Sequence, residues 1–458
     1  MRALENSDAR ALLTELYYSA VRAAAPGPAV EAALTANRGG NERPWIIALG
    51  KAAHPMASAA VRFLERAGLE PAGGIIVAPA EESLNQVSAS TSRSPHPNIT
   101  ISTGDHPEPG GRSLMAGAKI GEVARLARKG KEVWVLLSGG ATSLSAAPVD
   151  NVSPRDLTAL FATLLGSGLD ISVMNTVRKR FSRWGAGRLA ASLYPARVRV
   201  LVVSDVIGDD LSAIGSGPCV PDDSTAAQVR KILVDRGLWQ QTPETVRVEL
   251  ERTERDSSLE TPKAGDPCFR SVESAIIANN KTALDGAGER AREFGFHTVI
   301  HTVPLCGTAA TAGAFVLDLF GDHANSASQR APLCLIAGGE TVVKLQSADP
   351  AARDVDYVVP PGGRCQELAL AAARVLGAMP GNTSALLAAG TDGRDGPTDA
   401  AGAIVDGTTW ERIKSAGRVP EEDLARHNSY SALNSAGALL RTGLTGTNVA
   451  DIVIAAQM

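Results

Sequence analysis

The sequence predicts a two-domain α/β protein: a Rossmann-like N-terminal domain built on a parallel sheet, then a smaller α/β domain. Short apolar runs alternate with stretches of helical spacing along most of the chain, the pattern of βαβ units and a parallel sheet. The length of 458 residues exceeds the usual size of one domain. A composition that is 44% hydrophobic and 21% charged gives each domain enough apolar residues for an ordinary core.

Seven apolar runs are predicted to be strands, and nearly all of them end in Gly, Ser, Asp or Asn. They are WIIAL (45–49), GIIVA (74–78), VWVLL (133–137), VRVLVV (198–203), SAIIA (274–278), LCLIA (333–337) and SALLAA (384–389). Ligands bind beyond the carboxyl ends of strands in such sheets, so we expect the chemistry in the residues that follow each run. A last strand, DIVIAAQ (451–457), could return to the first domain.

One segment marks the expected domain boundary. Residues 247–267 are first highly charged and then rich in Pro and Gly, which is typical of a linker. We therefore expect a first domain over residues 1–260 and a second over residues 261–458.

Charge and composition argue against several classes of protein. The net charge of −4, with no basic block, is not that of a nucleic-acid-binding protein. No run approaches 18 apolar residues, and the amphipathic N-terminus lacks the apolar centre of a signal peptide, so we expect no membrane contact. Five scattered cysteines without a CxxC pair argue against disulfides and structural zinc, which fits a cytoplasmic protein.

Two loops after predicted strands are candidates for binding anions. Lys51 follows the first strand and opens a helical pattern, where its charge can neutralise phosphate oxygens; the alternative is a solvated lysine. The loop at 138–143 combines flexible glycine backbone with hydroxyl donors. Its candidate residues are Ser138, Gly139, Gly140, Thr142 and Ser143.

A basic segment at 174–190 follows. If it is helical, Asn175, Arg178 and Lys179 share one face, which can bind phosphate or carboxylate or can simply be solvated. Further along, Asp205 ends a strand and Asp209 follows Gly208, an arrangement that suits a general base or a metal ligand better than a plain turn.

Three later loops complete the candidate site. Gly338 and Glu340 follow one strand, and Gly363 with Arg364 opens a clear helix, where backbone donors and a guanidinium can spread phosphoryl charge. Asp392 lies in the glycine-rich segment 388–407, which suits a cation or a base, although Asp and Gly are also ordinary turn residues. A buried thiol is the favoured interpretation of Cys365.

Several familiar catalytic motifs are absent. The chain has no GxxxxGK[ST] phosphate loop, no GxGxxG opening a helix, no GxSxG and no HExxH. The sequence therefore argues against a P-loop enzyme, a standard dinucleotide-binding enzyme, an α/β-hydrolase and a zinc protease.

Taken in order, ten short motifs resemble the glycerate 2-kinase family with its C-terminal MOFRL domain, from about residue 8 to the end. They are GKAA (50–53), DHPEP (105–109), SGG (138–140), NTVRK (175–179), SDVIGDDL (204–211), SGPCVPD (216–222), GGET (338–341), GGRCQELAL (362–370), AAGTDGRDGPTDAAGA (388–403) and TGTNVAD (445–451). The resemblance implies phosphorylation of D-glycerate on its 2-hydroxyl, with ATP and Mg²⁺ or another divalent cation.

Residue by residue, the resemblance implies that Lys51 and Arg364 are the family's essential cations and that Asp205 is its strand-end aspartate. The sequence departs from the family pattern at Ala141-Thr142, at Cys365 and at Gly185-Ala186. These changes bear on substrate detail and rate rather than on the fold.

Our hypothesis places Lys51 and Arg364 on the transferring phosphoryl group, with the active site in the interdomain cleft. Asp205 is the base or a metal ligand, and Asp209 and Asp392 are further metal candidates. Two alternatives stay open: an NAD(P)H-dependent hydroxypyruvate reductase and a nonenzymatic sugar-acid binding protein. The expected partners are small molecules, glycerate and ATP, and the expected state is a monomer or a homodimer.

Overall fold

The computed structural model describes residues 6–36, 42–80, 93–106, 108–326, 331–344, 361–379 and 383–457. The chain divides into two compact units. The central unit is Pro26–Ile277, and the terminal unit combines Met1–Ala25 with Ala278–Met458. Among the described helices, none is both long and apolar enough to cross a lipid bilayer.

The central unit is built on a sheet with the strand order β3-β2-β1-β4-β5-β6, which is the order of a Rossmann-like fold. The first five strands pair in parallel. The strands are β1 (Trp45–Leu49), β2 (Gly73–Pro79), β3 (Ile99–Gly104), β4 (Glu132–Leu137), β5 (Arg197–Val203) and β6 (Val272–Ala278). β1 is buried over four of its five residues and β4 over all six, as expected for central strands covered on both faces.

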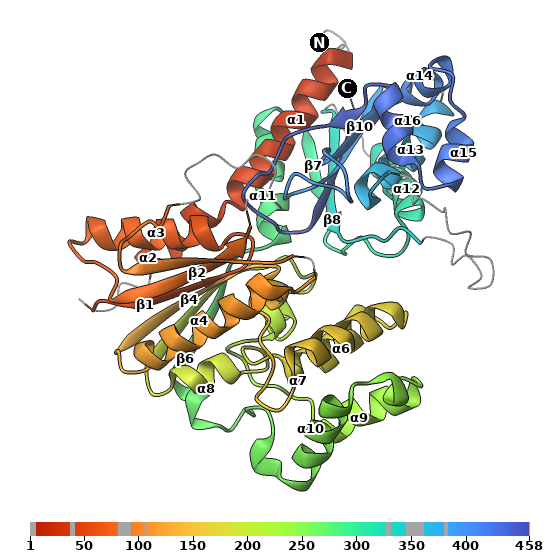
Figure 1. The fold of residues 1–458 in the computed structure, drawn as a ribbon. Coiled ribbons are helices and arrows are strands. Elements are labelled where there is room, and N and C mark those ends of the chain that lie inside the picture. The colour runs from red at the N-terminus through yellow and green to blue at the C-terminus, as the bar shows by residue number, and fades with distance from the viewer. Residues whose placement is uncertain are drawn as a thin grey trace. The chain divides into compact units, whose positions relative to one another are not determined.

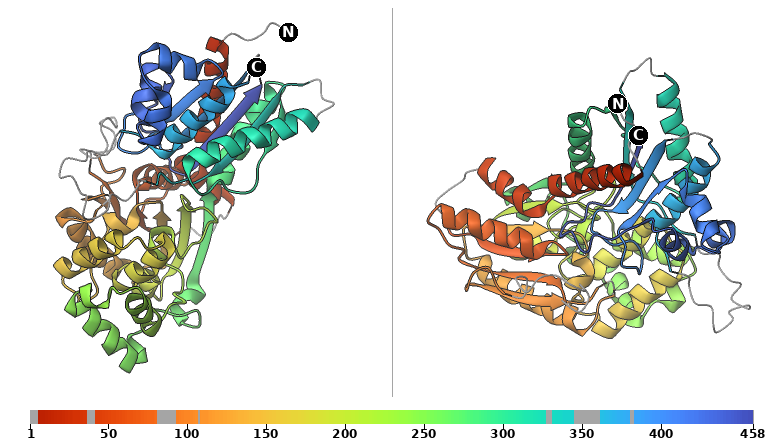
Figure 2. Two further views of the ribbon diagram at one scale, coloured as in Figure 1. Left: turned by 90° about the vertical axis from the view of Figure 1, so that its right-hand side faces the viewer. Right: turned by 90° about the horizontal axis from the view of Figure 1, so that it is seen from above.

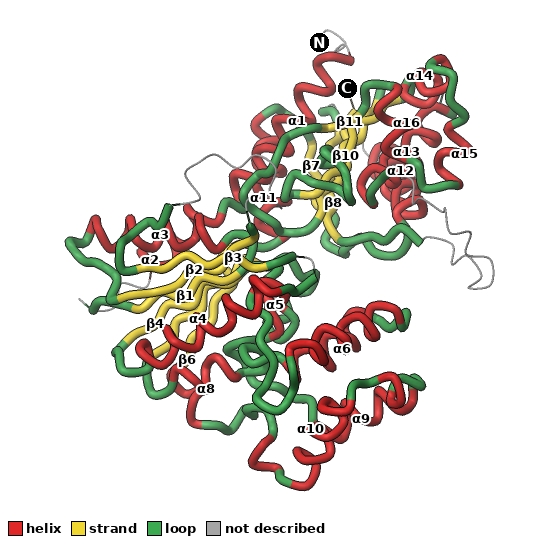
Figure 3. Tube along the Cα trace, in the orientation of Figure 1, coloured by secondary structure: helices red, strands yellow, loops and turns green. Residues whose placement is uncertain are grey.

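Helices cover both faces of this sheet (Figure 1, Figure 3). Those packed on one face or the other are α2 (Pro26–Ala36), α3 (Ala53–Arg66), α4 (Gly111–Ala127), α5 (Ala141–Leu144) and α8 (Arg188–Leu193). A separate apolar cluster joins α6 (Pro154–Gly166), α7 (Ile171–Phe181), α9 (Ala226–Asp235) and α10 (Glu244–Arg255). The charged part of the expected linker is therefore the helix α10. Tertiary packing stabilises this helix, because Val246 and Leu250 are buried in that cluster.

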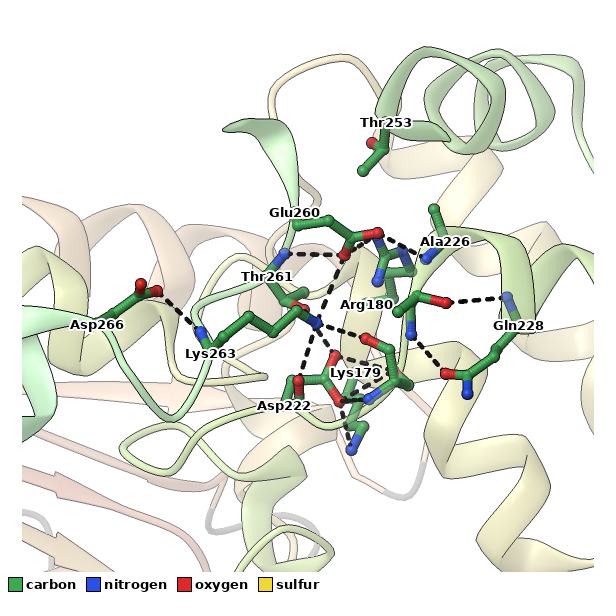
Figure 4. A network of polar contacts seen from close by, with 12 residues as sticks. Lys179, Arg180, Asp222, Ala226, Gln228, Thr253, Glu260, Thr261, Lys263 and Asp266 are labelled. Atoms are coloured by element: carbon green, nitrogen blue, oxygen red, sulfur yellow. Dashed lines mark hydrogen bonds and ion pairs between the residues drawn. The ribbon is translucent and has the colours of Figure 1, made fainter. Parts of the chain in front are cut away.

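A buried polar network ties α7 to the segments at 222–224 and 260–263 (Figure 4). Lys179 Nζ lies 2.8 Å from Asp222 Oδ1, and Asp222 also accepts hydrogen bonds from Ser224 and Thr261. Arg180 pairs with Glu260 at 2.5 Å. These contacts explain why the central unit extends to Ile277 rather than ending at the expected residue 260.

The terminal unit is built on a second sheet with the order β11-β10-β9-β12-β8-β7. β7 and β8 pair in parallel, whereas β12 is antiparallel to both β8 and β9, and β10 is antiparallel to β9 and β11. The strands are β7 (His297–Ile300), β8 (Leu333–Gly339), β9 (Ser384–Gly390), β10 (Gly402–Asp406), β11 (Leu439–Leu440) and β12 (Asp451–Gln457). The last strand therefore lies inside this sheet and does not return to the first.

Two helices from distant parts of the chain cover one face of the second sheet: α1 (Asn6–Ala23) and α11 (Asn280–Glu293). The first helix and the last strand lie side by side (Figure 1, Figure 2). The other helices of the unit are α12 (Ala309–Ser326), α13 (Arg364–Gly377), α14 (Thr409–Ser415), α15 (Pro420–Ala425) and α16 (Ser429–Ser435). Burial of Leu13, Leu16 and Tyr17 explains why the N-terminal helix belongs here and not to the expected first domain.

The predicted mixed α/β architecture is confirmed, and each predicted apolar run is a strand. Four strands were not predicted from the sequence: β3, β7, β10 and β11. β3 mixes isoleucine with Thr and Ser, β7 is only half-buried, and β11 has two residues, so these three lack the continuous apolar signal of a central strand.

We predict that Asp222→Asn lowers the free energy of unfolding by about 3 kcal/mol or more, because it leaves the ammonium of Lys179 buried without its partner. Asp235→Asn is the matched control, since Asp235 pairs with Lys231 on the exposed surface of α9 and such pairs contribute about 0–1 kcal/mol. Urea unfolding of both variants measures the difference.

The same comparison has a pH dependence. Burial raises the pKa of Asp222, but hydrogen bonds and charge from Lys179 outweigh burial and lower it below its ordinary 3.8. As pH falls, Asp222 is therefore protonated in the unfolded chain before it is protonated in the folded protein. Its contribution to the free energy of unfolding is complete above about pH 4 and is lost below it. The stability gap between wild type and Asp222→Asn should be largest near pH 7 and should shrink toward pH 3; a constant gap would contradict this account.

Candidate active site

In the central unit, three predicted segments meet at one edge of the first sheet. Lys51 follows β1, Ser138 follows β4 and Asp205 follows β5, and these are neighbouring parallel strands whose carboxyl ends coincide. Two hydrogen bonds join the first two segments: the Lys51 amide donates to Gly139 O at 2.9 Å, and the Ala52 amide donates to Ser138 Oγ at 3.0 Å. Topology therefore brings together residues that are far apart in the sequence.

Gly139 is the contact point between this loop and Asp205. A Cβ atom on Gly139 would lie 1.7 Å from Asp205 Oδ2, so only glycine allows the carboxylate to rest on the loop backbone. Gly140 adopts a φ of +82°, a conformation that side chains rarely tolerate. The two glycines thus permit a close approach and a turn.

His106 lies beside these residues and was not among the predicted site residues. A Cβ atom on Gly140 would lie 3.1 Å from His106 Cδ2 and 3.4 Å from Lys51 Cγ. Burial, together with the charge of Lys51, lowers the pKa of His106 to about 4, so its ring is neutral at physiological pH. The only sequence signal for it was the DHPEP motif, because a single histidine beside prolines resembles an ordinary loop.

Thr142 and Ser143, the later two of the loop's three hydroxyl residues, make contacts within the central unit. Thr142 Oγ1 lies 2.9 Å from Ser216 Oγ, and Ser143 Oγ donates to Gly140 O at 3.1 Å. Ser216 O also accepts from the amide of Ala186, so two departures from the family pattern, Thr142 and Ala186, contact the same serine. These contacts hold both hydroxyls in place within the loop.

The basic segment is the helix α7, as predicted, but its candidates differ in their surroundings. Lys179 is engaged in the buried pair with Asp222 described above. Arg178 stacks over the Phe161 ring at 5.1 Å, its Nε is buried without a hydrogen-bond partner in the described structure, and burial lowers the pKa of its guanidinium. Asn175 is half-buried on the same helix, and Asp209 is half-buried with a φ of +57°.

In the terminal unit, the predicted arginine is held by two carboxylates. Arg364 donates from Nε and Nη2 to the two oxygens of Asp451, at 2.6 and 3.1 Å, and from Nη1 to Glu340 at 2.6 Å. Burial opposes the charge of Arg364, but Asp451 and Glu340 outweigh burial and raise its pKa. The guanidinium is thus permanently charged and fixed in orientation.

Asp451 was not predicted because it begins a strand instead of following one. In the antiparallel sheet, Asp451 pairs with Gly339 on β8 and with Gly390 on β9, so the start of β12 lies at the carboxyl ends of its neighbours. Asn280 fixes the same corner: its Nδ2 donates to Val449 O and Asp451 O, and a Cβ on Gly338 would lie 2.0 Å from its Oδ1.

The start of α13 is occupied by a buried carboxylate. Asp395 accepts from the amides of Cys365 and Gln366 at 3.1 and 2.8 Å, and a Cβ on Gly363 would lie 2.3 Å from its carboxyl carbon. These two amides at the start of α13 are therefore hydrogen-bonded to Asp395. Burial raises the pKa of Asp395 to about 7 and also raises the pKa of the Cys365 thiol, as a buried rather than reactive cysteine requires.

Asp392 lies at the same edge. Its Oδ1 accepts from the Arg394 amide at 3.0 Å. A Cβ atom on Gly390 would lie 3.2 Å from Asp392 Oδ1 and 3.6 Å from Asp451 Oδ1, so both carboxylates flank this glycine. The described residues contain no group of three or more His, Cys, Asp or Glu side chains placed to hold a metal ion. A single carboxylate such as that of Asp392 is the kind of ligand that Mg²⁺ accepts when phosphate oxygens and water complete its shell.

Comparison with known proteins shows similarity over nearly the whole chain. Residues 12–251 match the model described as a domain of unknown function, DUF4147, and residues 333–451 match the MOFRL family. The chain is 37% identical over 414 residues to the D-glycerate 2-kinase of Thermotoga maritima, covering 90% of each protein. It is 33% identical over 445 residues to a putative hydroxypyruvate reductase of Agrobacterium vitis, covering 97% of this chain and 93% of that protein.

A solved structure agrees with these matches. The crystal structure of a glycerate kinase from Thermotoga maritima superimposes with a TM-score of 0.81 at 36% sequence identity, covering 98% of this chain and 99% of that one. The order of the motifs, both family models and the fold therefore point the same way: the chain belongs to the glycerate 2-kinase family with a C-terminal MOFRL domain.

Proposed function

We propose that this protein phosphorylates D-glycerate, with ATP as the phosphoryl donor and 2-phosphoglycerate as the product. One observation in the site carries the proposal: the Asp205 carboxylate rests on Gly139, while the Lys51 amide is hydrogen-bonded to the same glycine. A carboxylate beside a lysine at a strand edge can accept a hydroxyl proton next to a group that neutralises phosphoryl charge. The full-length similarity to a D-glycerate 2-kinase supports the choice of substrate.

Within this proposal, the candidate residues at the edge of the first sheet have distinct roles. Asp205 accepts the proton of the 2-hydroxyl or holds the cation. Lys51 neutralises charge on the transferring phosphoryl group. The loop at 138–140 holds an anion, either the glycerate carboxylate or a nucleotide phosphate. The neutral ring of His106 has one N–H group that can donate a hydrogen bond to this anion.

Arg364 is proposed to bind an anionic group, a phosphate or a carboxylate, at the edge of the second sheet. Three of its five N–H donors are engaged by Asp451 and Glu340, so two stay available within the described structure. Its fixed orientation means that little freedom is lost when an anion binds. The same contacts give Arg364 a structural role, since removing it would leave the buried Asp451 unpaired.

A divalent cation would be held by Asp205, Asp209 or Asp392 together with phosphate oxygens of the nucleotide, and when bound it would neutralise charge between the β- and γ-phosphates. Substitution of each aspartate by asparagine, followed by titration of the activity with Mg²⁺, identifies the one that holds the cation.

The alternative function is reduction of hydroxypyruvate with NAD(P)H, which the name of the Agrobacterium relative raises. The strand order of the first sheet would suit a dinucleotide. The loop after β1 argues against it, because GKAAHP at 50–55 has none of the later glycines that let a pyrophosphate approach the backbone. Oxidation of NADH by hydroxypyruvate, without ADP formation from ATP and glycerate, would reverse this choice.

We predict that Lys51→Ala lowers kcat at least about a hundredfold, because a charge acting on the transition state contributes roughly 3 kcal/mol or more. The fold should persist, since the Lys51 side chain is exposed. Lys231→Ala, an exposed lysine on α9, is the control and should behave as wild type. A near-normal kcat in Lys51→Ala would remove this lysine from the mechanism.

We predict that Asp205→Asn lowers kcat far more than it weakens ATP binding if Asp205 is the base. If Asp205 holds the cation, high Mg²⁺ or Mn²⁺ should restore part of the activity. Asp210→Asn serves as the control, because the exposed Asp210 only caps its own turn through Ser212. Full activity of Asp205→Asn would exclude both roles.

We predict that enolase and pyruvate kinase convert the product without phosphoglycerate mutase. A carboxylate held in the site brings the adjacent C2 hydroxyl closest to it, and positioning on this scale selects the attacking oxygen. Added 3-phosphoglycerate is the negative control for contaminating mutase. A signal that needs added mutase would show that the 3-hydroxyl is phosphorylated instead.

A further inference from the structure

We propose that Tyr17, on the N-terminal helix, positions the Asp392 turn, defined as residues 390–394. This turn begins at the last residue of β9. The inference rests on the proposed role of Asp392 in holding the nucleotide and its divalent cation. Tyr17 Oη donates to Gly390 O at 2.9 Å, across 373 positions of sequence. Residue 390 is the last of β9 and the residue flanked by the carboxylates of Asp392 and Asp451.

The Tyr17 hydroxyl is a buried donor with no access to solvent. The residue is 0% exposed and is among the largest fully buried side chains. Burial raises the pKa of Tyr17 far above the physiological range, so its hydroxyl stays protonated and remains a hydrogen-bond donor. Mutation is therefore the way to remove this donor. The Gly390 carbonyl would lose a buried partner if this hydroxyl were removed.

The rest of the turn is clamped by groups of the same unit. Thr445 donates from its amide to Asp392 O at 3.2 Å and from Oγ1 to Thr391 O at 2.6 Å. Thr391 Oγ1 donates to Ala450 O at 2.6 Å, one residue before Asp451. Gly393 has a φ of +86°, and a Cβ there would lie 2.0 Å from Gly443 O. The turn is thus held on one side by 443–450 and on the other by Tyr17.

Tyr17 is the tyrosine of α1 whose hydroxyl reaches this turn. The adjacent Tyr18 stacks edge-on against Tyr17, with ring centroids 5.5 Å apart, but is half-buried and, within the described residues, does not donate to Gly390. A change from Tyr to Phe at position 17 keeps the ring and its packing and removes only the donor. The same change at position 18 removes an equivalent hydroxyl from the same helix and is the matched control.

The experiment compares Tyr17→Phe and Tyr18→Phe in the full chain, each with and without Asp392→Asn. Two measurements are made: amide hydrogen exchange of residues 391–394, and the Kd of ADP with Mn²⁺ by calorimetry. For Tyr17→Phe, we expect the exchange rate of these amides and the Kd of ADP each to increase about fivefold, which is the effect of one lost hydrogen bond. Tyr18→Phe should change neither quantity.

The double variant separates positioning from a general loss of stability. If Tyr17 acts through Asp392, Tyr17→Phe should add no further increase in Kd once Asp392→Asn is present. Equal effects in both backgrounds, or unchanged exchange and Kd in Tyr17→Phe, would overturn the proposal. If Asp392→Asn itself leaves the Kd unchanged, the proposed role of Asp392 fails, and faster exchange in Tyr17→Phe alone would then still show that Tyr17 holds the turn.

Discussion

Direct contact between a polar side chain and the backbone of a glycine is the constraint on which both candidate sites depend. Asp205 rests on Gly139, Asn280 on Gly338 and Asp395 on Gly363, and a Cβ atom at any of these glycines would lie within about 2.5 Å of the side chain it meets. The glycines are therefore required before any ligand is considered. At each of them, a carboxylate or amide group from another residue occupies the space that a side chain would otherwise fill.

Two ion pairs with buried carboxylates illustrate different uses of charge. The pair of Lys179 with Asp222 is closed, because its carboxylate is fully buried and surrounded by donors from its own unit. The pair of Arg364 with Asp451 is open: the arginine side chain is 35% exposed and has donors to spare. Coulomb attraction stabilises both, but only the second leaves an oriented charge that a ligand can reach.

The chain topology makes the two termini part of one unit. The first helix packs beside the last strand, and both contribute groups to the edge of the second sheet where Arg364 lies. The function proposed for this edge thus depends in part on α1, a segment that the sequence analysis assigned to the other domain. Burial of the apolar face of α1 on the sheet explains the assignment, since an isolated amphipathic helix would leave that face in water.

The sequence by itself determined the α/β class, the central strands and the strand-end position of Lys51 and Asp205, because long apolar runs and Gly-rich ends depend only on local composition. Its motif order also determined the family. Only the tertiary structure decided the domain boundaries, the engagement of Lys179 by Asp222, and the places of His106, Asp451 and Tyr17. The physical reason is strand direction and long-range burial: Asp451 reaches the site because β12 runs antiparallel to β8 and β9, and no local pattern encodes the direction in which a strand pairs.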